Sequence, residues 1–359
     1  MAASHFTKNV REEQNCVKVS GMDFEQFLDK QAENINQRLT KVLEETVGKF
    51  SDYDKSLGEL FNAFSDSTKK GKRIRGVLVL LGYKIAGGKD FPAVIDAALA
   101  LEIFQTSILA QDDIIDKSPT RRGSPSLHIR LGGDHQAISQ TICLSDLGIF
   151  LSFRLLSSVK IADSLKNKAI NFFSQTLMQT VAGEMLDIKL SETKDFSEEG
   201  ALKIGLLKTA RYTVSGPLIL GAILAGGDIK LVKALQKFGD NLGIGFQVQD
   251  DIMGVFGEEE VIGKSATSDI AEGKATLMAA FAFNNSNSKD LEFLKQQYGN
   301  EKITPEDALK IRTILKDSGA LEYSEGVVRK YFEEARRGLK EGEESILYSL
   351  VEYISRRQK

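Results

Sequence analysis

The chain of 359 residues contains no tryptophan, five prolines, two cysteines and three histidines. The absence of tryptophan excludes a ligand pocket built on indole rings. The scarcity of proline favours long uninterrupted helices over a loop-rich or all-β fold. Because Cys16 and Cys143 lie far apart in sequence, we expect no disulfide framework and a reducing, cytoplasmic location. The few histidines, without a CxxC or HxxxH pattern, argue against a zinc site.

An excess of charge of one sign is also missing. The chain has 47 Lys and Arg residues against 50 Asp and Glu residues, a formal net charge of −3. No global basic field therefore exists to attract nucleic acid or an anionic membrane. The N-terminus has no apolar core of the kind found in secretory signals, and the most apolar windows, 76–82 and 214–227, are shorter than the roughly 18 residues that span a bilayer. We expect no nucleic-acid partner and no transmembrane segment.

From residue 23 onward the sequence has the pattern of helices. Apolar residues recur at spacings of three and four, as over Ile35–Leu43, and the short breaks between such stretches carry glycine pairs or proline. Thr304 before Pro305 predicts the capped start of a helix. No alternating strand pattern and no compositional boundary is present. The sequence predicts a flexible tail over residues 1–22 and one all-α domain over 23–359, although length alone suggests two domains.

Two acidic clusters stand in otherwise apolar surroundings. Asp112 and Asp116 are four residues apart, so on a helix their carboxylates share one face, and Gln105 falls on the same stripe. The second cluster repeats the arrangement with Gln247 and Asp250. Buried carboxylates this close repel each other unless a cation compensates them, and oxygen ligands without nearby His or Cys favour Mg²⁺. The alternative for either cluster alone is an acidic helix end in solvent.

Magnesium held by a few carboxylates usually also binds substrate phosphate, so the chain should supply cations for that phosphate. The candidates are Lys72, Arg73, Arg75, Arg121, Arg122, Lys208, Lys264 and Lys274. The run over residues 69–75, taken alone, has the composition of a nucleic-acid or nuclear-localisation patch, an alternative that the net charge of −3 disfavours.

Taken together, these motifs resemble those of the trans-isoprenyl diphosphate synthases, or polyprenyl synthetases. The resemblance runs from about Gly71 to Lys274 and rests on Asp112-Asp113-Ile114-Ile115-Asp116, Arg121-Arg122-Gly123, Phe246-Gln247-Val248-Gln249-Asp250-Asp251, Gly263-Lys264 and Asp269-Ile270-Ala271-Glu272-Gly273-Lys274. It implies an isoprenoid-synthase-type bundle of about ten or more helices around a central cavity. It also implies a prenyltransferase, typically homodimeric, that condenses isopentenyl diphosphate head to tail with allylic diphosphates.

The resemblance further implies roles for individual residues. Asp112 and Asp116 would hold two Mg²⁺ ions and Asp250 a third. Contacts to the allylic diphosphate would come from Arg121, Lys208, Thr209, Gln247, Lys264 and Lys274, and contacts to isopentenyl diphosphate from Lys72, Arg75, Gln105 and Arg122. Catalysis would depend most on Asp112, Asp116, Arg121, Lys208, Asp250 and Lys264.

The sequence departs from the family pattern at four positions. Gly254 stands where many members have a third Asp in the second motif, and Gly76 stands where proline is common. Glu184 replaces a usual glutamine, and Gln111 a common histidine. None of the four removes a principal diphosphate contact.

In this family the product grows along the helix that carries the first motif. One helical turn rises about 5.4 Å, close to the length of one isoprene unit, so Ile108, Ser107 and Phe104 act as successive floors. Ser107 and Ile108 leave room for the growing product at the first of these positions, while Phe104 blocks it one helical turn deeper. This predicts geranylgeranyl diphosphate (C20) as the product, with farnesyl diphosphate (C15) and products of C25 and longer as alternatives.

Two alternatives belong to other classes. A class I terpene cyclase would share the fold and the first motif, but no matching Ser follows Asp250-Asp251 and aromatic residues make up only 8% of the chain. A non-catalytic subunit of a heteromeric synthase usually loses one Asp motif, whereas this chain keeps both.

Overall fold

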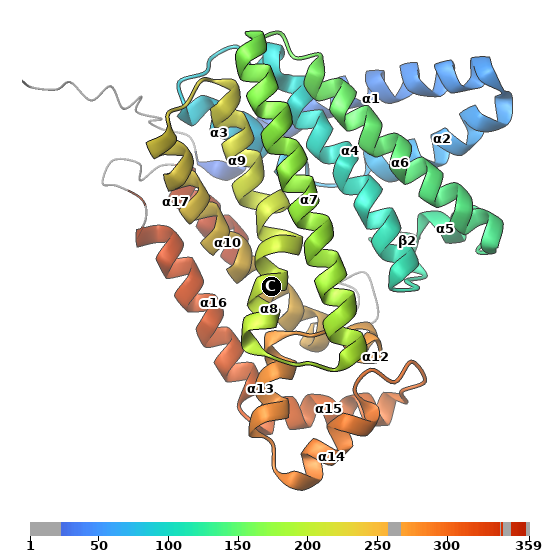
Figure 1. Ribbon diagram of the computed structural model, residues 1–359, viewed down its shortest axis with the longest axis vertical. Coiled ribbons are helices and arrows are strands. Elements are labelled where there is room, and N and C mark those ends of the chain that lie inside the picture. The colour runs from blue at the N-terminus through green and yellow to red at the C-terminus, as the bar shows by residue number, and fades with distance from the viewer. Residues whose placement is uncertain (1–22, 258–266, 338, 340–345, 357–359) are drawn as a thin grey trace, which may run out of the picture.

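The computed structural model describes residues 23–257, 267–337, 339 and 346–356 (Figure 1). The predicted tail over residues 1–22 and the predicted site residue Lys264 lie outside them. Nearly all of the described chain is helical, which confirms the predicted all-α class; the strands it contains form one two-residue antiparallel ladder, in which Thr120 pairs with Pro125.

Where the connecting residues are described, the elements follow one another with short connections, as the glycine and proline breaks predict. They are α1 (Phe24–Tyr53), α2 (Lys55–Lys69), α3 (Ile74–Ile85), α4 (Phe91–Ile115), β1 (Thr120–Arg121), β2 (Ser124–Pro125), α5 (Leu127–Arg130), α6 (His135–Ser157), α7 (Asp163–Thr193), α8 (Glu198–Ile204), the π-helix η1 (Gly205–Ser215), α9 (Gly216–Leu224), α10 (Ile229–Phe256), α12 (Ser268–Glu272), α13 (Leu277–Asn285), α14 (Ser288–Gln297), α15 (Pro305–Asp317), α16 (Ala320–Arg337) and α17 (Ile346–Ser355).

Helix starts are fixed by side chains that satisfy free backbone N–H groups. The Asp134 carboxylate accepts from Ala137 N at 2.8 Å at the start of α6, and the Asp228 carboxylate does the same for α10. The predicted cap of α15 is confirmed, because the Thr304 hydroxyl accepts from Asp307 N at 3.1 Å. These local signals set the helix boundaries from which the bundle is assembled.

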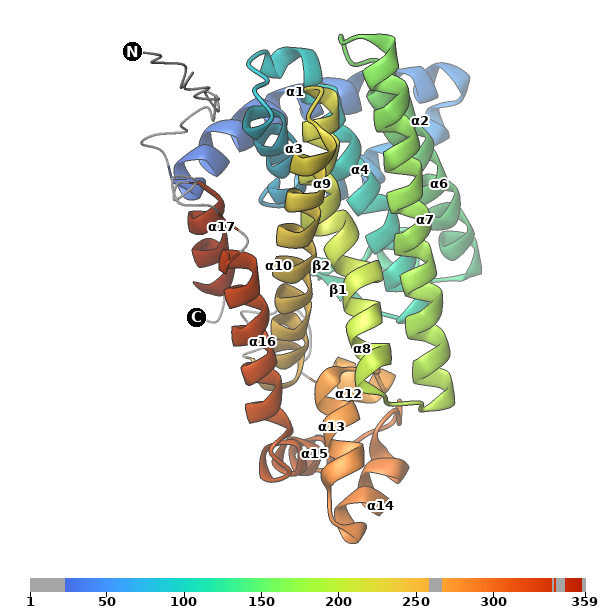
Figure 2. The same ribbon diagram turned by 60° about the vertical axis from the view of Figure 1, so that its left-hand side comes forward.

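The long helices form a bundle with a smaller lobe at one end. Helices α4, α6 and α7 run side by side, α10 packs against η1 and α16, and α3 packs against α9 (Figures 1 and 2). Helices α12 to α15 gather at the lower end of Figure 1, where Phe196 and Tyr298 belong to a second apolar core. The first acidic motif ends α4 and the second lies near the end of α10, so both point toward the junction between bundle and lobe.

Two helices are longer and more apolar than the sequence windows indicated, which corrects the expected length of the apolar stretches but does not contradict the expectation of no transmembrane segment. Helices α4 and α6 are long and apolar enough to cross a membrane by length and composition. In α4 the apolar window is 61% buried inside the protein, as in the core helix of a bundle, whereas in α6 it is 39% buried. One side of α6 therefore presents apolar surface outward.

Candidate active site

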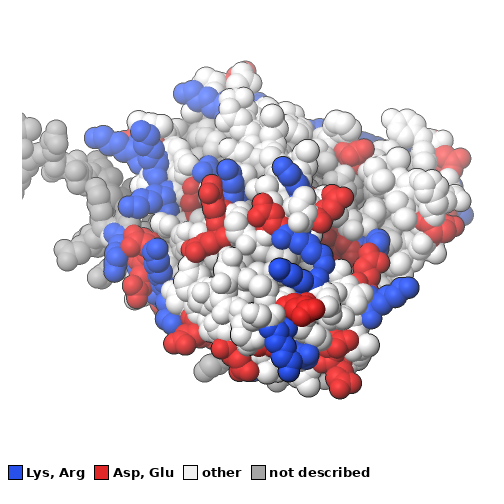
Figure 3. Space-filling model, turned by 60° about the horizontal axis from the view of Figure 1, so that its bottom comes forward, with Lys and Arg blue, Asp and Glu red and all other residues white. Residues whose placement is uncertain are grey.

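A cavity of about 800 Å³ opens between α4, α7, η1, α10 and the segment after α12. The predicted site residues that line it are Lys72, Arg75, Gln105, Ile108, Asp112, Asp116, Arg121, Arg122, Lys208, Thr209, Gln247, Asp250 and Lys274. The fold thus brings together side chains from six segments of the chain. Acidic and basic side chains are interspersed on the face at the lobe end, so no patch of one sign covers that face (Figure 3).

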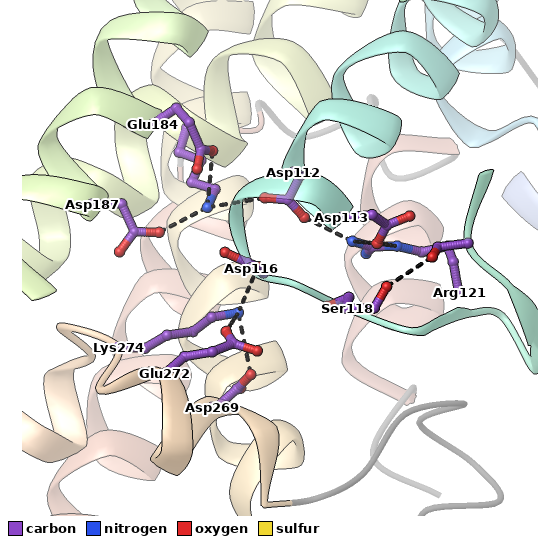
Figure 4. Close-up of polar contacts among 12 residues, drawn as sticks. Asp112, Asp113, Asp116, Ser118, Arg121, Glu184, Asp187, Asp269, Glu272 and Lys274 are labelled. Atoms are coloured by element: carbon purple, nitrogen blue, oxygen red, sulfur yellow. Dashed lines mark hydrogen bonds and ion pairs between the residues drawn. The ribbon is translucent and has the colours of Figure 1, made fainter. Parts of the chain in front are cut away.

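The first motif forms a charged cluster with Arg121 at the end of α4 (Figure 4). Arg121 donates from Nη2 to Asp112 Oδ2 and from Nε to Asp113 Oδ1, both at 2.7 Å. Burial would lower the pKa of Arg121, but the two carboxylates raise it overall. Burial would likewise raise the pKa of Asp112, but Lys208 and Arg121 hold it well below its usual range. Asp113, which was not among the predicted site residues, therefore positions the arginine.

Lys208 links α4 to α7. Its ammonium lies 2.7 Å from Asp187 Oδ2, 2.9 Å from Glu184 Oε2 and 3.3 Å from Asp112 Oδ1. These carboxylates outweigh burial and raise the pKa of Lys208 well above its ordinary value. The approach depends on Gly183, because a Cβ there would lie 2.3 Å from the Lys208 backbone nitrogen. A π-helix at this position is typical of functional sites, and here it carries a predicted diphosphate contact.

Lys274 makes the corresponding link from the lobe. Its ammonium lies 3.2 Å from both Asp269 Oδ1 and Glu272 Oε2 and 3.7 Å from Asp116 Oδ2 (Figure 4). Burial would lower the pKa of Lys274, but Asp269 and the other carboxylates raise it well above its ordinary value. The buried Tyr298 donates its hydroxyl proton to the Lys274 carbonyl at 2.7 Å. This hydrogen bond from the lobe holds the backbone of Lys274, and the Lys274 side chain extends from there toward Asp116 of the first motif.

The second motif is held by a chain of hydrogen bonds. The Thr209 hydroxyl on η1 donates to the Gln247 side-chain oxygen, and Gln247 Nε2 donates to Asp251 Oδ1 at 2.7 Å. Burial, reinforced by the charge of Asp269, raises the pKa of Asp251 to about 7. Asp250 lines the cavity beside this chain. The network fixes α10 against η1 and so sets the position of Asp250.

A basic group that includes Arg75 and Arg122 also lines the cavity. Arg75 Nη2 donates to Thr213 Oγ1 at 2.8 Å and to the Tyr212 hydroxyl at 3.0 Å, and the guanidinium stacks 4.4 Å above the Tyr212 ring. Its Nε is buried and has no hydrogen-bond partner among the described residues, which leaves a donor for a ligand. Arg122 donates to the Lys70 carbonyl at 2.6 Å. Burial and the nearby Arg75 lower the pKa of Arg122.

The basic run over residues 69–75 is divided by the fold. Arg73 is 3% exposed and lies 3.6 Å from Glu102, while Lys72 and Arg75 line the cavity. The departure at Gly76 has a structural reason, because its N–H donates to Glu102 Oε1 at 2.8 Å, a bond that proline could not make.

The three predicted chain-length residues occupy different places. Ile108 lines the cavity, whereas Phe104 and Ser107 are buried and do not. The Phe104 ring packs edge to face against Tyr212, at 6.1 Å between centroids, and against Phe173 at 6.0 Å. Ser107 donates to the Ile103 carbonyl at 3.2 Å and sits against Gly148 of α6.

Several residues of the site were not predicted from the sequence. Asp187, Asp251 and Asp269 all line the cavity, yet none was assigned a role from its motif. Asp187 and Glu184 are three residues apart on α7, a helical spacing that places two acids on one face and is the one local signal for this pair. Asp269 comes close to the motifs only through the tertiary fold.

The carboxylates that line the cavity fit Mg²⁺ bound together with a phosphate ligand. Asp112, Asp116 and Asp250 offer hard carboxylate oxygens to one cavity. Within the described residues, no group of three or more His, Cys, Asp or Glu side chains is arranged as a ready-made metal cage. Mg²⁺ is usually bound by one or two carboxylates and completed by substrate phosphates and water, so the arrangement suits this ion together with a phosphate ligand.

Comparison with known proteins gives a consistent result. The family profile described as polyprenyl synthetase matches residues 56–315. A short chain isoprenyl diphosphate synthase of Methanothermobacter thermautotrophicus is 33% identical over 281 residues, 77% of this chain and 82% of the relative. The geranylfarnesyl diphosphate synthase of Aeropyrum pernix is 30% identical over 270 residues, 74% of this chain and 82% of the relative.

The solved structures agree with the sequence relatives. Geranylgeranyl pyrophosphate synthase from Corynebacterium glutamicum, complexed with isoprenyl diphosphate and magnesium, superposes with a TM-score of 0.87 at 29% identity. The superposition covers 94% of this chain and 100% of that one. Polyprenyl synthase from Caulobacter crescentus, complexed with calcium and isoprenyl diphosphate, gives a TM-score of 0.78 at 26% identity over 92% and 97% of the two chains.

Proposed function

Since the chain belongs to the polyprenyl synthetase family and is therefore a trans-prenyltransferase, we propose that it condenses isopentenyl diphosphate with an allylic diphosphate to a short-chain prenyl diphosphate. The observation that carries the proposal is the convergence of both Asp motifs with Arg121, Lys208 and Lys274 on one cavity. Opposed carboxylates with interleaved cations are what a metal–diphosphate complex requires. The relatives named above are prenyl diphosphate synthases, which disfavours a terpene cyclase or a non-catalytic subunit.

Asp112 and Asp116 would hold two Mg²⁺ ions and Asp250 a third. The relatives solved with magnesium or calcium and isoprenyl diphosphate support divalent-metal use in this cavity. When bound, the metal supplies positive charge that makes diphosphate a better leaving group. The protein supplies the remaining charge: Arg121 by its planar fork, and Lys208 and Lys274 as point charges.

The two substrates would lie on opposite sides of the cavity. Thr209 and Gln247, with Arg121, Lys208, Lys274 and Lys264, would bind the allylic diphosphate, and Lys72, Arg75, Gln105 and Arg122 the isopentenyl diphosphate. The free Nε of Arg75 suits the latter role. The C–O bond of the allylic substrate breaks and diphosphate leaves with the electron pair. The isopentenyl double bond attacks C1, and a proton passes to the departing diphosphate.

The apolar wall of the cavity would protect the allylic cation from water. Leu109, Val181 and Ile188 contribute to that wall, and Ile108 and Tyr212 also line the cavity. Because Phe104 packs behind Tyr212, we propose that it limits the product to geranylgeranyl diphosphate (C20). Phe104→Ala should lengthen the product, and an unchanged product length would contradict this role. The Aeropyrum relative, a geranylfarnesyl diphosphate synthase, keeps a C25 product among the alternatives, together with farnesyl diphosphate.

The decisive experiment is incubation of the protein with labelled isopentenyl diphosphate, Mg²⁺ and each of the C5, C10 and C15 allylic diphosphates. Chromatography of the dephosphorylated products gives the chain length, with C20 expected. Asp112→Asn should abolish turnover while the helical circular-dichroism spectrum is kept. Absence of incorporation with every starter would refute the proposed reaction.

The protein would act as a homodimer through α6 and α7, two helices that contact each other. Phe150 on α6 is 73% exposed, and Met178 on α7 is 70% exposed. Exposed apolar residues gathered on adjacent helices are typical of an interface. Sedimentation should give a dimer for the wild type and a monomer for Phe150→Glu with Met178→Glu, while Tyr53→Glu, a matched exposed apolar position, stays dimeric. A monomeric wild type would exclude the dimer.

A further inference from the structure

The last position of the second Asp motif is filled by a carboxylate from another part of the chain. Gly254 lies near the end of α10, and a Cβ placed on it would lie 1.9 Å from Asp269 Oδ2 and 3.0 Å from Asp269 Cγ. Asp269 comes from the first turn of α12 and is 3% exposed. The volume that a side chain at 254 would need is therefore already occupied by an acid.

The same carboxylate is tied to the cation of the lobe. Asp269 Oδ1 lies 3.2 Å from Lys274 Nζ, and the Asp269 carbonyl accepts from Lys274 N at 3.2 Å. Lys274 in turn reaches Asp116 Oδ2 at 3.7 Å. Both Gly254 and Asp269 line the cavity. A shift of Asp269 would consequently displace the cation that faces the first motif.

We propose that Asp269 is a positioning residue that holds Lys274 toward the first motif, and that Gly254 is required to leave the space that the Asp269 carboxylate occupies. The inference rests on the proposed function, because it concerns how the site receives a metal–diphosphate complex. A side chain at 254 would push Asp269 away from α10 and draw Lys274 with it. Restoring the aspartate that many family members have at 254 would therefore weaken diphosphate binding. If Gly254 merely left the site one carboxylate short, the same change would strengthen diphosphate binding.

The test measures binding rather than turnover, by isothermal titration calorimetry of the full chain with inorganic diphosphate in the presence of Mg²⁺. Gly254→Ala and Gly254→Asp should each weaken diphosphate binding about tenfold, as expected when a charge-assisted contact is lost. Asp269→Asn, which keeps the size of the side chain, should weaken it comparably. The double variant Gly254→Asp with Asp269→Gly returns one carboxylate to the same space and should recover most of the loss.

Controls separate this inference from the proposed function. Gly48→Ala, at a helical glycine of α1 with no atom within 4 Å of the added Cβ, should bind like the wild type. If Asp112→Asn also binds like the wild type, the proposed function fails; if it loses binding while the other variants behave as the wild type, only the role of Asp269 fails. Tighter binding by Gly254→Asp, or unchanged binding by Asp269→Asn, overturns the proposal. Should Gly254→Ala not fold, Asp269→Asn and the double variant still decide it.

Discussion

Replacement of Gly183 by alanine tests whether the close approach of α7 and η1 positions Lys208. The added Cβ would lie 2.3 Å from the Lys208 backbone nitrogen, and ordinary contact begins at 3.4 Å. The two helices must therefore separate by about 3.4 − 2.3 = 1.1 Å, because the obstructing atoms belong to the backbone and cannot rotate away. That movement would carry the Lys208 ammonium away from Asp187, which it now meets at 2.7 Å.

The expected effects are of two kinds. Overpacking of this sort typically costs about 1–3 kcal/mol of folding free energy. Misplacement of a binding group by about 1 Å can cost about a hundredfold in rate, so kcat/KM for the allylic diphosphate should fall by that order while the protein remains folded. Activity is measured by incorporation of labelled isopentenyl diphosphate, and stability by urea unfolding.

The matched control is Gly48→Ala, where the added methyl group meets open space. It should keep full activity and gain up to about 1 kcal/mol of stability from the better helix propensity of alanine. If Gly183→Ala is as active as the wild type, the contact between α7 and η1 does not position Lys208, and that part of the account is wrong.

Three further predictions concern the polar network of the site. Tyr298→Phe removes the hydroxyl that donates to the Lys274 carbonyl at 2.7 Å but keeps the buried ring. It should cost about 1 kcal/mol of stability in urea unfolding and weaken Mg²⁺–diphosphate binding in calorimetry. Unchanged diphosphate affinity would argue against a link between Tyr298 and the site. Burial raises the pKa of Asp251 from 3.8 to about 7, so between these values the native state binds more protons than the unfolded chain. The stability of the chelator-treated protein should therefore fall as the pH rises through this window, and Asp251→Asn should fall less; identical slopes would refute the assignment. Glu184→Gln removes a negative charge 2.9 Å from Lys208 and should tighten diphosphate binding a few-fold, with weaker binding as the contrary result.

The placements that the sequence alone indicates are mainly local. The four-residue spacing of Asp112 and Asp116 needs only helix geometry, and both line the cavity at the end of α4. The cap at Thr304 likewise depends on neighbouring residues alone. Beyond these local patterns, the family resemblance pointed to Lys72 and Lys274. Both line the same cavity, although they come from segments far apart in the chain.

The features that were missed depend on which helices touch. Gly183 is an ordinary small residue in the sequence, and Gly254 stands out there only as a departure from the family pattern. Their structural importance lies in the Lys208 backbone and the Asp269 carboxylate that approach them. The π-helix η1 is set by packing rather than by a local signal, since its residues have no pattern that separates it from an α-helix. The partners of Lys208 come from two other helices, so no spacing rule could reveal them.

The central claim is that both Asp motifs bind one metal–diphosphate complex. It is tested most directly by a crystal structure of the protein grown with Mn²⁺ and inorganic diphosphate, with the metals located by anomalous scattering. The account predicts metal ions at Asp112 and Asp116 and at Asp250, all bridged by one diphosphate that Lys208 and Lys274 contact. Metal at a single motif, or diphosphate bound outside this cavity, would contradict it.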